Sequence, residues 1–389
     1  MVSIPYGRQS INQADIDSVI AVLRSNYLTQ GPLVPAFEKA ISDYCNVANA
    51  VAFNSATSAL HVACLALGIK EGDIVWTSPI TFVASANCAI YCGATIDFVD
   101  IDPRTYNLDV VQLEQKLVLA QKMGMLPQLV IPVHLAGQPC DMVRIHSLSK
   151  KYGFKVIEDA SHAIGGQYKG LPIGNCNYSD ITVFSFHPVK IITSGEGGMA
   201  LTVNNALAKK MRLLRSHGIT NEVSDMQERS DEEIWNYQQI DLGFNYRMTD
   251  LQAALGYSQL QRIDQFVEQR HSIARRYNSL LAGCPLVLPY QDAEGFSSYH
   301  LYIIRLKLGE LNKAHHEVYK ELHARGVLVN LHYIPVYRQP YYEKMGFSEG
   351  YCPQAEKYFS EALSLPMYPG LTDAEQLYVV NSLHEVMAI

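Results

Sequence analysis

The sequence predicts an α/β protein: a large domain with a mainly parallel central sheet sandwiched by helices, then a smaller C-terminal α+β domain. Its 389 residues exceed what one hydrophobic core usually organises, which favours two domains. With 48% hydrophobic and 18% charged residues, the composition is that of an ordinary globular protein. Between about residues 50 and 205, short apolar runs alternate with helical stretches, as in a parallel sheet buried on both faces.

Six apolar runs are the predicted strands of this sheet. Between the first two, Leu60, Ala63, Cys64 and Leu67 recur at helical spacing, and Gly68 follows as a C-terminal cap. The chain is therefore expected to continue as one strand–helix unit after another. The six runs are residues 50–53, 74–76, 96–99, 129–131, 156–157 and 181–184.

The pattern changes in the second half of the chain. Residues from about 205 to 280 carry a mostly helical pattern without a strand signal, interrupted by a polar insertion near 221–233 and by the segment 241–247. After Pro289 the pattern predicts a strand around 302–306, a helix near 314–325, a strand over 327–331 and two terminal helices. We place the boundary near residue 250, which gives a large domain over 1–250 and a small domain over 251–389.

Charge and cysteine usage exclude several classes of protein. The net charge of −7 argues against a nucleic-acid-binding surface. No apolar signal segment opens the chain and no apolar run is long enough to span a membrane, so we expect a cytoplasmic protein. The eight cysteines lack close C-x-x-C pairs, and Cys88 and Cys92, four apart on a predicted helix, have apolar neighbours. We expect neither a structural metal nor a disulfide.

Asp159 and Lys190 each follow a predicted strand. Ligands of open α/β sheets bind at the carboxyl ends of the strands, so both side chains belong to one edge of the sheet. Taken alone, an aspartate there is more often a helix cap, and a loop lysine is nearly always a solvated charge. Here, however, Pro188 stiffens the approach to Lys190 and a glycine-rich flexible run follows at 194–198, so the amine could form a Schiff base.

A third element is the turn of small residues from Asn54 to Leu60, which leads from a strand into a helix. The free N–H groups and positive dipole end of a helix N-terminus suit a phosphate, although a plain Ser/Thr cap is the simpler interpretation of this turn alone. An amine for a Schiff base, a carboxylate for a ring nitrogen and an anion cradle together match pyridoxal 5'-phosphate.

These motifs occur in a set that resembles the DegT/DnrJ/EryC1/StrS sugar aminotransferases, within fold type I of the pyridoxal-phosphate enzymes. The resemblance extends over essentially the whole chain. One departure is Ala56, which stands where a glycine often precedes the threonine of the phosphate turn. The motifs are LTQGP at 28–32, ATSAL at 56–60, TFVAS at 81–85, FVDID at 98–102, PVHLAGQP at 132–139, EDASH at 158–162, SFHPVK at 185–190 and GFNYRM at 243–248.

The resemblance implies a role for each matching residue. Lys190 matches the Schiff-base lysine, Asp159 the partner of the pyridine nitrogen, Phe82 the aromatic stacked on the ring and His162 the residue beside the phenolic oxygen of the ring. By themselves, Phe82 and His162 would be taken as core residues. The phosphate contacts correspond to Ala56, Thr57 and Ser185, and Asn245 corresponds to a residue that reaches the neighbouring subunit's phosphate, which implies a homodimer.

Within the family, the stretches 186–190, 216–220 and 241–250 look closest to the C4-aminotransferases of pseudaminic acid biosynthesis. That resemblance implies a UDP-linked 4-keto-6-deoxy-N-acetylhexosamine as acceptor and L-glutamate as donor. Four alternatives stay open: an aminotransferase for another nucleotide-linked keto-sugar, a sugar dehydratase with histidine in place of Lys190, a non-catalytic regulator, and an amino-acid aminotransferase of the same fold type. An amino-acid aminotransferase would devote an arginine to the substrate carboxylate, and Arg247 and Arg338 are the candidates for that task.

Overall fold

A computed structural model of the chain describes residues 3–228 and 233–387. Its centre is a seven-stranded sheet whose strands are β2 (Asn49–Phe53), β3 (Ile74–Thr77), β4 (Thr95–Phe98), β5 (Leu129–Ile131), β6 (Lys155–Asp159), β9 (Ile181–Ser185) and β10 (Gly198–Thr202). Their order is β2-β10-β9-β6-β5-β3-β4. β10 is antiparallel to both of its neighbours, and the other strands run in one direction. The predicted fold class is thus confirmed. Five of the six apolar runs lie within a strand, and the run 96–99 extends one residue, Val99, beyond the end of β4.

The seventh strand, β10, is absent from the sequence-based prediction, which takes residues 194–198 as a flexible run. Gly198 is in fact the first residue of β10. A Cβ atom at Gly198 would lie 2.5 Å from the backbone oxygen of Ser55. The glycine therefore allows the strand to pass close to the turn at Ser55, which opens the helix Ala56–Ala66. The absence of a side chain also weakens the strand signal.

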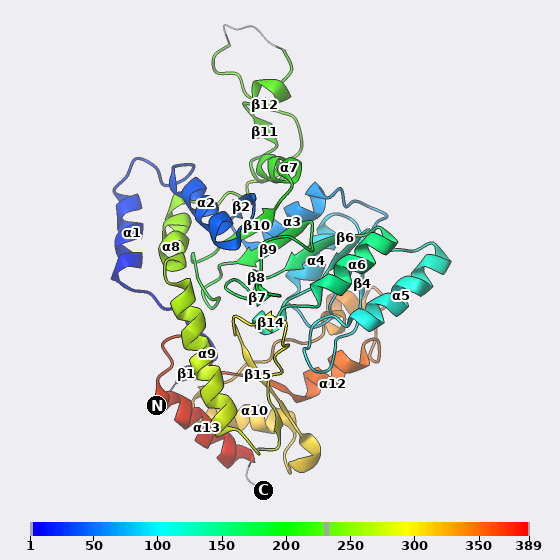
Figure 1. The fold of residues 1–389 in the computed structure, drawn as a ribbon, viewed down its shortest axis with the longest axis vertical. Coiled ribbons are helices and arrows are strands. Elements are labelled where there is room, and N and C mark those ends of the chain that lie inside the picture. The colour runs from blue at the N-terminus through cyan, green and yellow to red at the C-terminus, as the bar shows by residue number, and fades with distance from the viewer. Residues whose placement is uncertain (1–2, 229–232, 388–389) are drawn as a thin grey trace.

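Helices cover both faces of the sheet (Figure 1). Successive strand residues point to opposite faces, so Val51 and Phe53 pack on one side while Ala50 and Ala52 pack on the other. One face packs against α3 (Ala56–Ala66), α4 (Ala84–Tyr91) and α7 (Asn205–Arg215). The other packs against α2 (Leu33–Cys45), α5 (Val110–Met123), α6 (Met142–Tyr152) and α8 (Asp250–Leu260), and α8 also packs against α1 (Gln13–Leu23).

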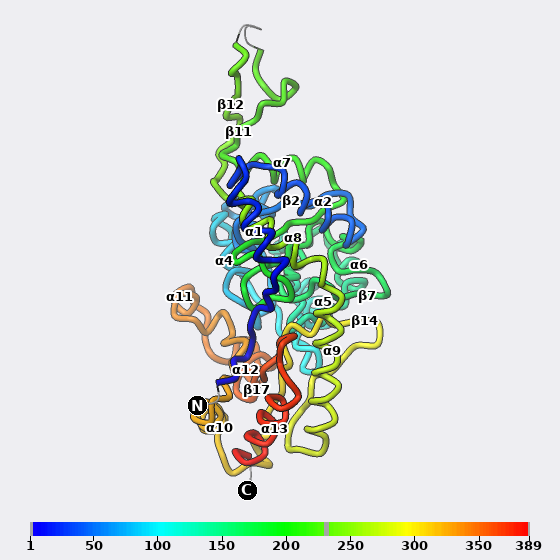
Figure 2. Tube along the Cα trace, turned by 90° about the vertical axis from the view of Figure 1, so that its left-hand side faces the viewer, coloured from blue at the N-terminus to red at the C-terminus, as the bar shows by residue number. Residues whose placement is uncertain are grey.

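A second hydrophobic core lies at the end of the molecule that holds both termini (Figures 1 and 2). It surrounds a three-stranded antiparallel sheet of β13 (Leu286–Val287), β15 (Tyr302–Leu306) and β17 (Ala362–Leu365). The helices around it are α9 (Ile263–Leu280), α10 (His315–Ala324) and α13 (Asp373–Met387). Beside it, β1 (Ile4–Pro5) pairs in parallel with β16 (Val327–Leu328).

The strand predicted at 302–306 and the helix predicted at 314–325 are present as β15 and α10. The strand predicted at 327–331 is shorter, and β17 separates the two predicted terminal helices, α12 (Pro353–Glu361) and α13. The short α11 (Pro340–Glu343) precedes them, and a small sheet is formed by β7 (Gln167–Tyr168), β8 (Leu171–Pro172) and β14 (Gly295–Phe296). The domain boundary near residue 250 stays a prediction.

An arm projects from the molecule beyond α7 (Figures 1 and 2). Its base is the antiparallel pair β11 (Ile219–Thr220) and β12 (Gln238–Gln239), where the sequence pattern carries no strand signal. Strands of two residues are too short to show an alternation of apolar and polar side chains, which explains why the sequence does not predict them. Part of the predicted polar insertion, residues 229–232, lies outside the described residues. Within those described, no helix combines the length and apolar character that crossing a membrane requires.

Candidate active site

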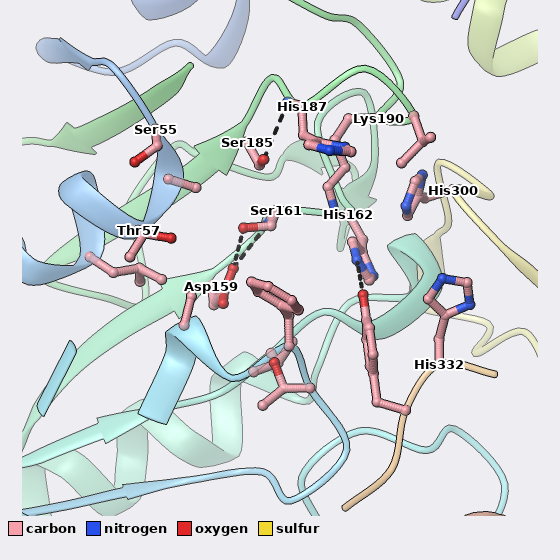
Figure 3. Close-up of a pocket in the computed structure, with 18 of the residues that line it drawn as sticks. Ser55, Thr57, Asp159, Ser161, His162, Ser185, His187, Lys190, His300 and His332 are labelled. Atoms are coloured by element: carbon pink, nitrogen blue, oxygen red, sulfur yellow. Dashed lines mark hydrogen bonds between the residues drawn. The ribbon is translucent and has the colours of Figure 1, made fainter. Parts of the chain in front are cut away.

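A cavity of about 580 Å³ lies at the carboxyl ends of β6 and β9 (Figure 3). Strands that are far apart in sequence bring the predicted residues to it, because parallel neighbours end at the same edge of the sheet. The predicted residues that line the cavity are Ala56, Thr57, Phe82, Asp159, His162, Ser185 and Lys190. Asn245 does not line it; this residue is exposed on the segment that follows β12.

Lys190 lies in the turn after β9, where its backbone N–H donates to the carbonyl of His187 (2.9 Å). Burial of the ammonium lowers the pKa of Lys190 to about 8, and the nearby Asp159 carboxylate offsets part of this effect. About a tenth of the Lys190 side chains are therefore neutral amines at pH 7, far more than at the ordinary pKa of lysine. This is the form that attacks a carbonyl carbon.

Asp159 is buried at the end of β6, and three hydrogen bonds orient its carboxylate. Oδ1 accepts from the backbone N–H (3.1 Å) and the hydroxyl (2.6 Å) of Ser161, and Oδ2 accepts from the hydroxyl of Ser85 (2.5 Å). Ser85 lies on α4, and its hydroxyl is also 2.7 Å from Thr81 Oγ1. Both carboxylate oxygens are thus held in place while the group faces the cavity.

The N-terminus of α3 opens onto the same cavity. The Ser55 side chain caps the helix by accepting the N–H of Ser58 (3.1 Å). Among the described residues, the N–H groups of Ala56 and Thr57 have no acceptor, as expected for the first turn of a helix. Ser185 faces this turn across the cavity (Figure 3). The arrangement offers hydrogen-bond donors and a positive dipole end to an anion.

His162 is buried beside Lys190. Its Nδ1 accepts the backbone N–H of Ala136 (3.3 Å), and its Nε2 lies 3.2 Å from the hydroxyl of Tyr333. Burial, together with the charge of Lys190 and the proximity of His332, lowers the pKa of His162 well below its usual value. The imidazole is therefore neutral. The Phe82 ring nearby is 59% exposed, which leaves its face free to stack on a bound group.

Several lining residues carry no signal in the sequence. Tyr6, His300, His332 and Tyr333 reach the cavity from the N-terminal segment and from the second half of the chain. The rings of Tyr6 and His332 lie 5.0 Å apart, and burial together with Lys190 lowers the pKa of His332 to about 3. Ser85 and Ser161 are also assigned no role from the sequence, although both lie within motifs singled out there, at 81–85 and 158–162.

Neither arginine considered from the sequence lines the cavity. Arg338 lies within 3.6 Å of the carboxylates of Glu343, Glu349 and Glu356, which neutralise its charge. Among the described residues that line the cavity, Lys190 is the one lysine or arginine. The pKa values of the lining residues His162, His187 and His332 are lowered, which disfavours their charged forms. In the part of the chain that the structure describes, no arginine lines the cavity, whereas an amino-acid aminotransferase would devote one to the substrate carboxylate.

The donor set fits pyridoxal 5'-phosphate. An amine with a lowered pKa, a buried and oriented carboxylate, an exposed aromatic face and two unused helix N–H groups surround one cavity. Each of these matches one part of that cofactor: the aldehyde, the ring nitrogen, the ring face and the phosphate.

Comparison with known proteins places the chain among enzymes of one kind. The model of the DegT/DnrJ/EryC1/StrS aminotransferase family matches residues 9–384. The chain is 37% identical to UDP-4-amino-4,6-dideoxy-N-acetyl-beta-L-altrosamine transaminase of Campylobacter jejuni (99% of this chain, 97% of the relative). It is also 37% identical to GDP-perosamine synthase of Caulobacter vibrioides (99% and 98%). The structure of PseC of Helicobacter pylori, an aminotransferase of pseudoaminic acid biosynthesis, superposes with a TM-score of 0.90 at 28% identity, covering 99% of both chains.

Proposed function

The chain belongs to the DegT/DnrJ/EryC1/StrS family of pyridoxal-phosphate-dependent sugar aminotransferases, and on that premise we propose its specific reaction. It moves an amino group from L-glutamate to C4 of a UDP-linked 4-keto-6-deoxy-N-acetylhexosamine, a step of pseudaminic acid biosynthesis. The observation that carries the proposal is the convergence of Lys190, Asp159 and the N-terminus of α3 on one cavity.

When bound, pyridoxal phosphate supplies the electron sink that makes the proton on the donor's Cα acidic. Lys190 would hold the cofactor covalently and, once freed, would accept the proton that leaves Cα, because its pKa of about 8 suits a general base near neutral pH. Asp159 would face the ring nitrogen and favour its protonated form by charge. Ala56, Thr57 and Ser185 would bind the phosphate, and Phe82 would stack on the ring.

The choice of sugar rests on the Campylobacter relative, whose name specifies a UDP-linked 4-amino-4,6-dideoxy sugar. A relative that is equally similar is named for a GDP-linked product, so a different nucleotide-linked keto-sugar is the main alternative. Lys190 argues against the dehydratase, in which histidine replaces the lysine. The presence of Lys190, Asp159, Phe82 and His162 in one cavity argues against a non-catalytic regulator.

We also propose that the protein works as a homodimer to which Asn245 contributes across the interface. Two observations support this. Asn245 is exposed and outside the cavity of its own chain. The arm next to it presents exposed apolar side chains, Val223 (83%), Trp235 (74%) and Leu242 (77%), which are typical of an interaction surface. The cytoplasmic location stays a prediction from the sequence.

An amino-transfer assay with glutamate across a panel of UDP- and GDP-linked 4-keto sugars tests the proposed function. We expect turnover with the UDP-linked 4-keto-6-deoxy-N-acetylhexosamine and at least about a tenfold preference over GDP-linked ketones, a difference of about 1.4 kcal/mol in transition-state binding. Preference for a GDP-linked ketone would identify the alternative sugar, and no transfer to any ketone would refute the proposal.

A further inference from the structure

The hydroxyl of one tyrosine that lines the cavity meets a histidine ring nitrogen. Tyr333, which follows β16, lines the cavity with Lys190 and Asp159. Among the described residues, its hydroxyl has a single hydrogen-bond partner, Nε2 of His162 at 3.2 Å. The two rings are stacked, with centroids 6.2 Å apart and planes inclined by 26°.

The neighbours of His162 determine the direction of this hydrogen bond. Nδ1 of His162 accepts the N–H of Ala136, so Nδ1 carries no proton. Because the imidazole is neutral, its single proton is on Nε2, and this N–H donates to the oxygen of Tyr333. The phenolic O–H of Tyr333 is then left to donate to a bound molecule.

The surroundings of Tyr333 favour the protonated phenol. Burial and the nearby Tyr6 and Asp159 raise its pKa, so the hydroxyl is a donor throughout the physiological pH range. The titratable groups that face it from the packed elements are Tyr6, Asp159, His162, His332 and Tyr358.

We propose that Tyr333 donates this hydrogen bond to the phenolic oxygen of bound pyridoxal phosphate, and that His162 acts through Tyr333 as its positioning residue. The inference rests on the proposed function. If the ring nitrogen meets Asp159 and the aldehyde carbon meets Lys190, the ring oxygen would lie toward His162 and Tyr333, which line the same cavity. The N–H of His162 is already engaged by Tyr333. The free donor at that point is the Tyr333 hydroxyl.

A spectroscopic titration of the bound cofactor tests the proposal without relying on turnover. A donor to the charged ring oxygen lowers the proton affinity of the bound cofactor, so its loss raises the apparent pKa read from the absorbance. For Tyr333→Phe, which keeps the ring, we expect an upward shift of roughly one to two pKa units, the effect of one charge-assisted hydrogen bond. His162→Ala should give a smaller upward shift, and the double variant should shift no further than Tyr333→Phe.

The matched control is Tyr302→Phe. It removes another largely buried tyrosine hydroxyl, one that donates to Asn278 Oδ1 (2.6 Å) away from the cavity, and should leave the cofactor's pKa unchanged.

An unchanged pKa of the bound cofactor in Tyr333→Phe overturns the proposal. So does an unchanged pKa with weakened binding of the UDP-sugar in calorimetry, because the hydroxyl would then serve the sugar. Shifts that add in the double variant overturn the positioning role of His162. Failure of the proposed function is recognised separately: borohydride would then attach no cofactor to Lys190 of the wild type.

Discussion

The hydroxyl of Ser85 donates a 2.5 Å hydrogen bond to Oδ2 of Asp159, joining the first turn of α4 to the end of β6. The two residues are 74 positions apart in the chain. The orientation of the carboxylate at the floor of the cavity therefore depends on how α4 packs against the sheet. A bond of this kind to an ionised acceptor contributes about 1.5–3 kcal/mol.

Ser85→Ala should therefore weaken cofactor binding about tenfold, the low end of that range, because Ser161 still holds Oδ1. Titration of the apoprotein with pyridoxal phosphate, followed by absorbance, measures the affinity. The control is Ser147→Ala on α6, which removes an exposed hydroxyl bonded to Val143 O (2.9 Å). Equal affinities for the Ser85 and Ser147 variants would contradict the role given to Ser85.

Lys190→Ala should abolish turnover and covalent attachment of the cofactor while the fold survives, because the side chain serves chemistry more than packing. Borohydride reduction followed by peptide mass mapping locates the attachment in the wild type. Lys39→Ala, at an exposed ion pair on α2, is the control and should keep both properties. Recovery of the reduced cofactor on another lysine would show that the assignment of Lys190 is wrong.

Asp159→Asn should leave the cofactor bound but slow proton removal from glutamate roughly 10- to 1000-fold. A neutral amide cannot stabilise the ring's positive charge, and an opposite charge within about 4–6 Å shifts a pKa by about one to three units. Stopped-flow measurement of the half-reaction with glutamate gives the rate. A near-native rate would mean that Asp159 acts only as a structural acceptor for Ser85 and Ser161.

The lowered pKa of Lys190 predicts how attachment of the cofactor depends on pH. Only the neutral amine attacks the aldehyde, and the pKa of Lys190 in the folded protein is about 8. Below that value the neutral fraction rises about tenfold per pH unit, so the attachment rate should climb from pH 6 to 8 and level off above it. Stopped-flow mixing of apoprotein with cofactor measures this profile. A rate that continues to climb beyond pH 9 would mean that the amine is solvated and its pKa is near the ordinary value.

Mixed dimers test whether Asn245 crosses the interface. In a dimer of one Lys190→Ala chain and one Asn245→Asp chain, one composite site would contain both lesions and the other neither. Part of the activity lost in each homodimer should then return, because the added carboxylate repels the phosphate only in sites that contain it. Co-expression with two affinity tags and size-exclusion chromatography provides the mixed species. Mixed dimers that form without recovering activity would place Asn245 within its own subunit.

The strands of the sheet could be predicted because their signal is local. Runs such as 74–76 and 129–131 are apolar on both sides of the backbone, as is typical of parallel strands in a sheet that is covered by helices on both faces. β10 was not predicted because it begins with Gly198, which carries no strand signal. A glycine is needed at this position because the backbone of Ser55, far away in the sequence, lies too close for a side chain. β11 and β12 were not predicted because a strand of two residues is too short to show the alternation of apolar and polar side chains.

The residue types at the ends of β6 and β9 and at the start of α3 can be identified from the sequence, since strand ends and helix starts are local features. The other side chains that meet them are known from the three-dimensional packing. Ser85 reaches Asp159 through the packing of α4, and Tyr333 reaches His162 from 171 positions away. No periodicity or motif spacing encodes such contacts, because they depend on how strands are ordered in the sheet and how the second core docks beside it. The direction of a hydrogen bond is decided at that level too: His162 donates to Tyr333 because its other nitrogen meets the N–H of Ala136.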